Sequence, residues 1–171
     1  MIITAGKFKG QKILAPDENI TRPTLSKVRM GIFNTLQSMI DFEKSSFLDM
    51  YAGSGIMGLE ALSRNFLHAC AIEKHPKVLP IIKSNFKKFD PHPKLIIGDS
   101  LKITKNLTDK FDVIYIDPPY FSEIYEQSLN AVKNISSNLI ILEHVVPVDF
   151  SGYKLIKQKK YGDKYISFLG K

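Results

Sequence analysis

The chain has 171 residues, of which 44% are hydrophobic, and a formal net charge of +7. This length and composition predict one globular unit with a full core. No run of 18 apolar residues and no signal-peptide pattern occurs, so no transmembrane helix or secretory leader is expected. The single cysteine, Cys70, excludes a disulfide scaffold and favours a cytoplasmic protein with Cys70 in its core.

The positive charge is concentrated at the two ends of the chain. Residues 1–35 hold six basic and two acidic side chains (+4), and residues 151–171 hold six basic and one acidic (+5). The 12 basic and 14 acidic side chains of residues 36–150 sum to −2. This pattern predicts an anionic polymer bound by terminal segments around a nearly neutral body. A solvated lysine surface is the simpler alternative.

Apolar runs and turn residues predict alternating strands and helices. In chain order we expect a hairpin of residues 2–3 and 12–14, a helix over 25–39 capped by Thr24, a strand at 47–51, a helix at 56–64, a strand at 68–73, a helix with Pro76 in its first turn, a strand at 95–97, a strand at 111–116, a helix at about 123–135, a strand at 139–142, and a hairpin of 153–157 with 164–169.

Apolar strands separated by helices are typical of a parallel sheet covered on both faces. The sequence therefore predicts an α/β fold of Rossmann-like type: a mostly parallel sheet of seven strands, closed by an antiparallel C-terminal hairpin. We expect a single domain over residues 1–171. Within it, residues 1–35 would form a basic extension with a small hairpin and a helix, and residues 36–171 the catalytic core.

A glycine-rich segment follows the strand that ends near Asp49. Gly53, Ser54 and Gly55 form a loop before a helix, which lets backbone N–H groups approach a ligand closely. Glu73 ends the next strand, where a carboxylate suits ribose hydroxyls, and Asp99 follows the third, where it suits an adenine amino group.

Two ligands fit this pattern. The spacing Gly53-x-Gly55-x-x-Gly58 matches the dinucleotide fingerprint of NAD-binding enzymes. Asp49 argues against a pyrophosphate, because it places negative charge beside the loop. S-adenosyl-L-methionine carries a sulfonium, an ammonium, a ribose and an adenine, and it accounts for all these residues together.

The segment Asp117-Pro118-Pro119-Tyr120 follows the strand that ends at residue 116. Pro119 has no N–H and disfavours helical angles at Pro118, so the carbonyls before it remain available as acceptors. The Asp117 carboxylate adds a charged acceptor, and Tyr120 adds an aromatic face. Such a turn is suited to a planar group that carries an NH2.

With these motifs in order, the chain resembles the class I methyltransferases, and more narrowly the RsmD family of small-subunit (16S) rRNA guanine-N2 methyltransferases. The resemblance is carried by residues 6–10, Arg22-Pro23-Thr24, residues 28–34, Leu48-Asp49, residues 52–64 and Tyr161-Gly162. It implies that the cofactor is S-adenosyl-L-methionine and that no metal is needed. It also implies that the partner is rRNA within an assembled or assembling ribosomal subunit. A monomer is compatible with the pattern.

The resemblance also implies roles for individual residues. Asp117 and the Pro118 carbonyl would hold the amino group while Tyr120 stacks on the base. Asn34 would join Asp49, the glycine loop, Glu73 and Asp99 at the cofactor. Candidates for phosphate contacts are Lys7, Lys9, Lys12, Arg22 and Arg29. Arg22 or Arg29 could instead pair with a carboxylate near the cofactor.

Three other functions stay open. DNA adenine-N6 and protein glutamine-N5 methyltransferases carry similar motifs around an amino or amide group. An NAD-type dehydrogenase would use the glycine fingerprint but leaves Asp117-Pro118-Pro119-Tyr120 without a role. A non-catalytic RNA-binding protein on the same scaffold would not need the complete set of site residues.

Overall fold

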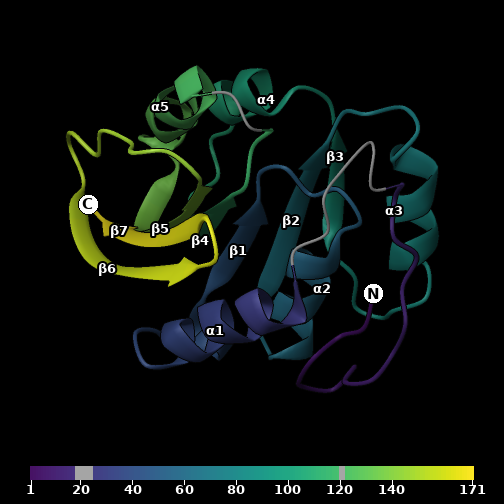
Figure 1. Ribbon diagram of the computed structural model, residues 1–171. Coiled ribbons are helices and arrows are strands. Elements are labelled where there is room, and N and C mark those ends of the chain that lie inside the picture. Colours follow the sequence, from purple (N-terminus) through teal and green to yellow (C-terminus); the bar gives the residue numbers. More distant parts are fainter. Residues whose placement is uncertain (18–24, 120–121) are drawn as a thin grey trace.

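Parallel strands joined by helices form the centre of the computed structural model, which describes residues 1–17, 25–119 and 122–171 (Figure 1). Seven strands make one sheet in the order β3-β2-β1-β4-β5-β7-β6. Strands β1 to β5 are parallel, whereas β7 is antiparallel to both of its neighbours. The strands are β1 (Ser46–Asp49), β2 (His68–Glu73), β3 (Lys94–Ile97), β4 (Phe111–Ile116), β5 (Ser136–His144), β6 (Lys154–Tyr161) and β7 (Lys164–Gly170). The predicted mixed sheet with a C-terminal hairpin is confirmed.

Helices cover both faces of this sheet (Figure 1). They are α1 (Ser26–Gln37), α2 (Ile56–Ser63), α3 (Leu79–Phe86), α4 (Ser100–Asn106) and α5 (Ser122–Val132), with a short 3-10 helix at Phe42–Lys44. Because successive strand residues point to opposite faces, two cores result. Phe47 belongs to the core under α1, α2 and α3, and Leu48 to the core under α4 and α5. Within the described ranges no helix has the length and apolar character needed to cross a membrane.

The N-terminal segment folds back on itself as the predicted hairpin, although its two arms are too short to form regular strands. Only one antiparallel bridge, between Ile2 and Lys12, occurs in residues 1–17. Backbone hydrogen bonds join the two arms, for example from the Ile3 N–H to the Gln11 carbonyl at 3.0 Å. The segment also buries Ile3, Phe8 and Ile13 in the core under α1–α3. Its backbone is held to α2 as well, because the Lys7 N–H donates to the Ser63 carbonyl at 2.8 Å.

Some predicted boundaries also differ. Helix α1 begins at Ser26 with Leu25 as N-cap, and Thr24 lies outside the described residues. Pro76 lies in a turn that precedes α3 rather than in the helix itself. Helix α5 ends at Val132, so β5 begins three residues before the predicted strand. Helix α4 was not predicted at all.

Candidate active site

The glycine loop joins β1 to α2 at the carboxyl edge of the sheet. Gly53 and Gly55 have φ angles of +53° and +81°, and Gly55 is the N-cap of α2. A Cβ at Gly55 would lie 2.3 Å from the Phe86 ring, whereas one at Gly53 would meet no atom within 4 Å. Ser54 is buried, and its carbonyl accepts from the Asn85 amide at 2.9 Å. The loop is thus anchored at Ser54 and Gly55 and open at Gly53.

Asp49, the last residue of β1, has a buried carboxylate. It is 1% exposed, and neither oxygen has a hydrogen bond of ordinary geometry to any residue that the structure describes. Burial raises its pKa to about 8, with Glu73 adding to the rise and the Tyr51 backbone N–H opposing it. An acid kept in this state is suited to a cationic ligand, because a positive charge supplies the missing partner.

Glu73 ends β2 and contacts the glycine loop directly. Its Oε2 accepts from the Gly53 N–H at 2.8 Å, and its Oε1 accepts from the N–H groups of Lys74 and His75 at 2.8 and 2.7 Å. A carboxylate has about four acceptor sites. Three are therefore used, which leaves one acceptor site of Glu73 open.

Asp99 has a structural task that the sequence analysis missed. It is the N-cap of α4, where Oδ1 accepts from the Lys102 N–H at 3.2 Å. Its Oδ2 lies 2.8 Å from Lys74 Nζ, and these contacts, the Lys74 hydrogen bond foremost, lower the pKa of Asp99. The side chain is half-exposed at the carboxyl edge of the sheet, where Asp49 and Glu73 also lie. These three residues are the carboxyl-edge acids.

Asp117 and Pro118 directly follow β4, which lies beside β1. From β1 the chain continues to β2 and β3, which lie on one side of β1 in the sheet, whereas from β4 it continues to β5 on the opposite side. The direction in which successive strands are added therefore reverses between β1 and β4. In α/β sheets, ligands bind in the crevice at such a switch point. The structure thus brings Asp49, the glycine loop, Glu73, Asp99 and Asp117 to one edge. Tyr120 and Arg22 lie outside the described residues.

The acidic character of this edge extends to a residue that the sequence analysis did not single out. Glu143, near the end of β5, is 1% exposed and accepts from the Tyr115 hydroxyl at 2.9 Å. It also pairs with Lys164 of β7. The signal was present in the sequence, since Glu143 ends an apolar strand in the same way as Asp49 and Glu73.

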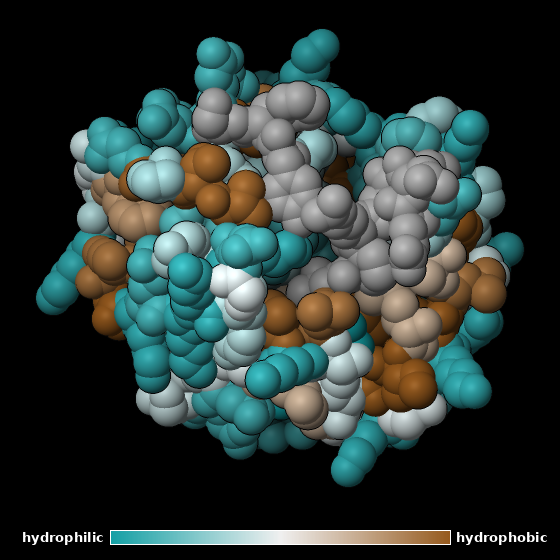
Figure 2. Space-filling model, in the orientation of Figure 1, coloured by the Kyte–Doolittle hydropathy of each residue, from teal (hydrophilic) through white to brown (hydrophobic). Residues whose placement is uncertain are grey.

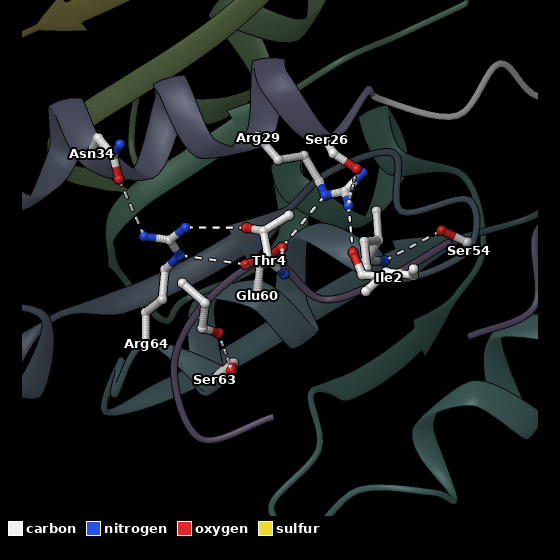
Figure 3. Close-up of polar contacts among 11 residues, drawn as sticks. Ile2, Thr4, Ser26, Arg29, Asn34, Ser54, Glu60, Ser63 and Arg64 are labelled. Atoms are coloured by element: carbon white, nitrogen blue, oxygen red, sulfur yellow. Dashed lines mark hydrogen bonds and ion pairs between the residues drawn. The ribbon is translucent and has the colours of Figure 1, made fainter. Parts of the chain in front are cut away.

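Arg29 is not available for phosphate contacts, contrary to our prediction. It is 1% exposed, with Nε 3.6 Å from Glu60 Oε1 and Nη2 2.6 Å from the Ile2 carbonyl oxygen (Figure 3). Burial lowers its pKa, and Glu60 opposes this effect. Arg29 does pair with a carboxylate, as the alternative held. That carboxylate belongs to the middle of α2, however, and not to the cofactor loop.

Asn34 and Lys7, two other candidates from the N-terminal region, also lie away from the glycine loop. Asn34 is exposed on α1, and its Oδ1 accepts from Arg64 at 3.5 Å (Figure 3). Arg64 is the C-cap of α2, whereas the glycine loop is at the other end of that helix, about 12 Å away. Lys7 lies at this same far end, beside Ser63. Lys9 and Lys12 are exposed.

Replacing Arg29 by Met is expected to lower the free energy of unfolding by about 2–3 kcal/mol. Loss of one partner from a buried pair costs roughly 3–5 kcal/mol. The cost is smaller here because Glu60 keeps Arg64 at 3.3 Å and the Thr4 N–H at 2.6 Å. Urea unfolding measures the difference, with Lys27→Met, an exposed change on the same helix, as control. Equal stabilities of the two variants would contradict the assignment.

Comparisons with known proteins agree with this geometry. The family model described as Conserved hypothetical protein 95 matches residues 1–170. Ribosomal RNA small subunit methyltransferase D of Buchnera aphidicola subsp. Acyrthosiphon pisum is 33% identical over 136 residues, which cover 77% of this chain and 69% of that protein. The Escherichia coli protein yhhF, described as a methyltransferase, has a TM-score of 0.88 at 25% identity and covers 100% of this chain and 97% of its own.

A more distant neighbour shares the fold alone. It is the tRNA (uracil-54, C5)-methyltransferase of Pyrococcus abyssi in complex with S-adenosyl-L-homocysteine, with a TM-score of 0.65 at 14% identity over 85% of this chain and 39% of that one. Because the family model spans nearly the whole chain, and because the carboxyl-edge acids surround a loop suited to a cationic nucleoside, the chain belongs to the RsmD family of S-adenosyl-L-methionine-dependent methyltransferases.

Proposed function

We propose that this methyltransferase modifies the exocyclic N2 amino group of a guanine in small-subunit rRNA. The observation that carries the proposal is the position of Asp117-Pro118-Pro119 directly after β4, beside β1 and its buried Asp49. The name of the Buchnera relative, a small-subunit rRNA methyltransferase, supports rRNA as the substrate.

The residues of the β1–β3 edge suit the methyl donor. Asp49, which has no charged partner among the described residues, would face the cationic part of S-adenosyl-L-methionine, and the open side of Gly53 leaves space for it. Glu73 keeps an acceptor site for a ribose hydroxyl. Asp99, half-exposed at the start of α4, is the nearest acid for the adenine amino group in this arrangement.

The residues that follow β4 suit the guanine that would accept the methyl group. The lone pair of guanine N2 is delocalised into the ring, so the nitrogen must become more tetrahedral as it attacks the methyl carbon. Asp117 and the Pro118 carbonyl would accept its two hydrogens and direct the lone pair at the methyl group. S-adenosyl-L-methionine would supply the methyl group to the nitrogen, its sulfur keeping the electron pair of the broken carbon–sulfur bond, and Asp117 would accept the proton that the nitrogen loses. Positioning supplies much of the rate enhancement in such a site.

The guanine must be unpaired or flipped, because its N2 is hydrogen-bonded within a duplex. Methyl transfer to small-subunit particles, naked rRNA, DNA and protein therefore tests the proposal. We expect transfer to one of the two rRNA substrates, and loss of one N2-methylguanosine from the rRNA of cells that lack the protein. Transfer to DNA adenine or to a glutamine amide would instead support one of the alternative functions.

The C-terminal hairpin has a basic surface whose lysines were not among the predicted phosphate contacts. Lys154, Lys157 and Lys160 are exposed on β6, the outermost strand. In Figure 2, hydrophilic side chains cover part of the region over this strand, beside hydrophobic ones, and Leu155 and Ile156 of β6 are exposed as well. Lysines on an edge strand also prevent strands of different molecules from pairing, so exposure alone does not establish RNA binding.

Salt dependence distinguishes these two roles. If all three β6 lysines contact phosphates, changing them to Gln should reduce the slope of log affinity against log salt concentration by about 2. The triple change of Lys7, Lys9 and Lys12 to Gln tests the predicted N-terminal phosphate contacts in the same way. Equal slopes for the wild-type protein and the β6 variant would show that these lysines only solvate the edge.

A further inference from the structure

A buried cluster of three ionisable side chains lies beside Asp117. Glu143 is held on one oxygen by Lys164 and on the other by the Tyr115 hydroxyl at 2.9 Å. The Glu143 side chain is fully buried, and that of Lys164 is 23% exposed. Removing an ion pair from water in this way costs free energy, so a gain in stability alone does not explain why the pair is present.

Strand register places this cluster next to the catalytic turn. Ile116 of β4 is paired with Leu142 of β5, so the residues that follow them, Asp117 and Glu143, are neighbours across the two parallel strands. Neighbouring strands lie about 4.8 Å apart. Alternation along each strand puts Tyr115, Asp117 and Glu143 on the same face of the sheet.

Lys164 reaches that face from the other side of β5. Glu143 is paired with Ile166 of the antiparallel β7, and Lys164, two residues from Ile166, points to the same face. The positive charge of Lys164 therefore lies on the face of the sheet that carries the two neighbouring carboxylates, Glu143 and Asp117. Without its positive charge, Glu143 and Asp117 would repel each other in a poorly solvated site.

The charges around Asp117 act in opposite directions, and their net effect with burial is a pKa well above the ordinary value of an aspartate. Burial raises the pKa of Asp117, and the negative charges of Glu143 and Asp49 raise it further. The positive charge of Lys164 and the Tyr115 hydroxyl lower it. Lys164 is thus the one cation among these groups that favours the ionised form.

We propose that Lys164, held in place by Glu143, is a positioning residue that keeps the Asp117 carboxylate ionised and able to accept the hydrogens of the substrate amino group. This inference rests on the proposed function. A protonated Asp117 has lost acceptor capacity and cannot take up the proton that leaves the nitrogen. The charge state of Asp117 therefore controls the rate on the acidic side of the pH profile.

The two members of the pair should shift the pH dependence of kcat in opposite directions. Lys164→Met removes the positive charge, so the acidic limb should move to higher pH, with at least a tenfold loss at pH 7 that recovers in alkaline buffer. Glu143→Gln removes the neighbouring negative charge, so the limb should move to lower pH. Lys164→Arg should restore the wild-type profile. A purely structural pair would instead lower the rate at every pH.

The matched control is Lys44→Met, which removes a lysine from an exposed ion pair with Asp41 and should leave the profile unchanged. Carbon-13 NMR titration of the Asp117 carboxyl in the unliganded protein, assigned by loss of its signal in Asp117→Asn, needs no substrate. An active wild-type enzyme whose Asp117 titration and acidic limb are unmoved by both variants would overturn this inference alone. Opposite shifts of the Asp117 titration in a protein that does not methylate rRNA would instead uphold charge control by Lys164 and overturn the proposed function.

Discussion

Replacing Asp117 by Ala is expected to abolish methyl transfer while leaving cofactor binding nearly intact. The change removes the charged acceptor that orients the amino group, and loss of one such positioned group costs roughly 10²–10³ in kcat. Asp117 follows β4, whereas the residues suited to the methyl donor follow β1, β2 and β3. The affinity for S-adenosyl-L-homocysteine should therefore change less than threefold, by calorimetry.

Single-turnover transfer to the rRNA substrate measures the loss. Asp149→Ala is the matched control, because Asp149 is an exposed carboxylate that bonds only locally to Ser151 among the described residues. Turnover by Asp117→Ala within about threefold of the control would remove Asp117 from the mechanism. A parallel loss of cofactor affinity would show that the crevice between β1 and β4 acts as one site.

The architecture was predictable because its signals are local and repeated. Buried parallel strands produce continuous apolar runs, such as residues 111–116, and intervening turn residues mark where each run ends. The carboxyl ends of parallel strands meet at one edge, so the acids that follow these runs could be grouped before any coordinates were known. The same logic would have included Glu143.

What the sequence analysis missed depends on long-range contacts or on weak local signals. Helix α4 has few buried residues, so its apolar period is faint, although Asp99 before Ser100 is a recognisable N-cap. Arg29 was interpreted from its charge and from its place in the motif that carries the family resemblance. It is three residues before Ile32 on the same helix, hence on the buried face, and its partner Glu60 lies 31 positions later in a wholly buried helix.

Replacing Asp49 by Asn should weaken the cofactor and stabilise the unliganded protein. The carboxylate is buried, it has no hydrogen bond of ordinary geometry within residues 1–17, 25–119 and 122–171, and its pKa is about 8 against an ordinary value of 3.8. The unfolded chain loses this proton near pH 4, whereas the folded chain holds it to about pH 8. The contribution of Asp49 to the free energy of unfolding is therefore fully present below pH 4. It falls as the pH rises toward 8, by about 1.4 kcal/mol per pH unit at most.

The sign of this effect can be tested by comparing melting temperatures at two pH values. Asp49→Asn should exceed the wild-type protein by several degrees at pH 8 and by little at pH 5, because Asn cannot ionise. Asp112→Asn is a suitable control: Asp112 accepts from the Ser46 N–H and hydroxyl at 2.9 and 2.8 Å, so its replacement should destabilise the protein. An unchanged difference between pH 5 and pH 8 would mean that Asp49 is already ionised in the folded state.

Cofactor binding should show the opposite dependence. A cationic ligand binds best to ionised Asp49, so the affinity of the wild-type protein for S-adenosyl-L-methionine should rise with pH until about pH 8 and then level off. Asp49→Asn should bind about 100-fold more weakly at pH 8 and lose that pH dependence, which calorimetry measures directly. A buried charge that destabilises the empty protein and is neutralised by the ligand links cofactor binding to folding, so S-adenosyl-L-methionine should raise the melting temperature of the wild-type protein more than that of the variant.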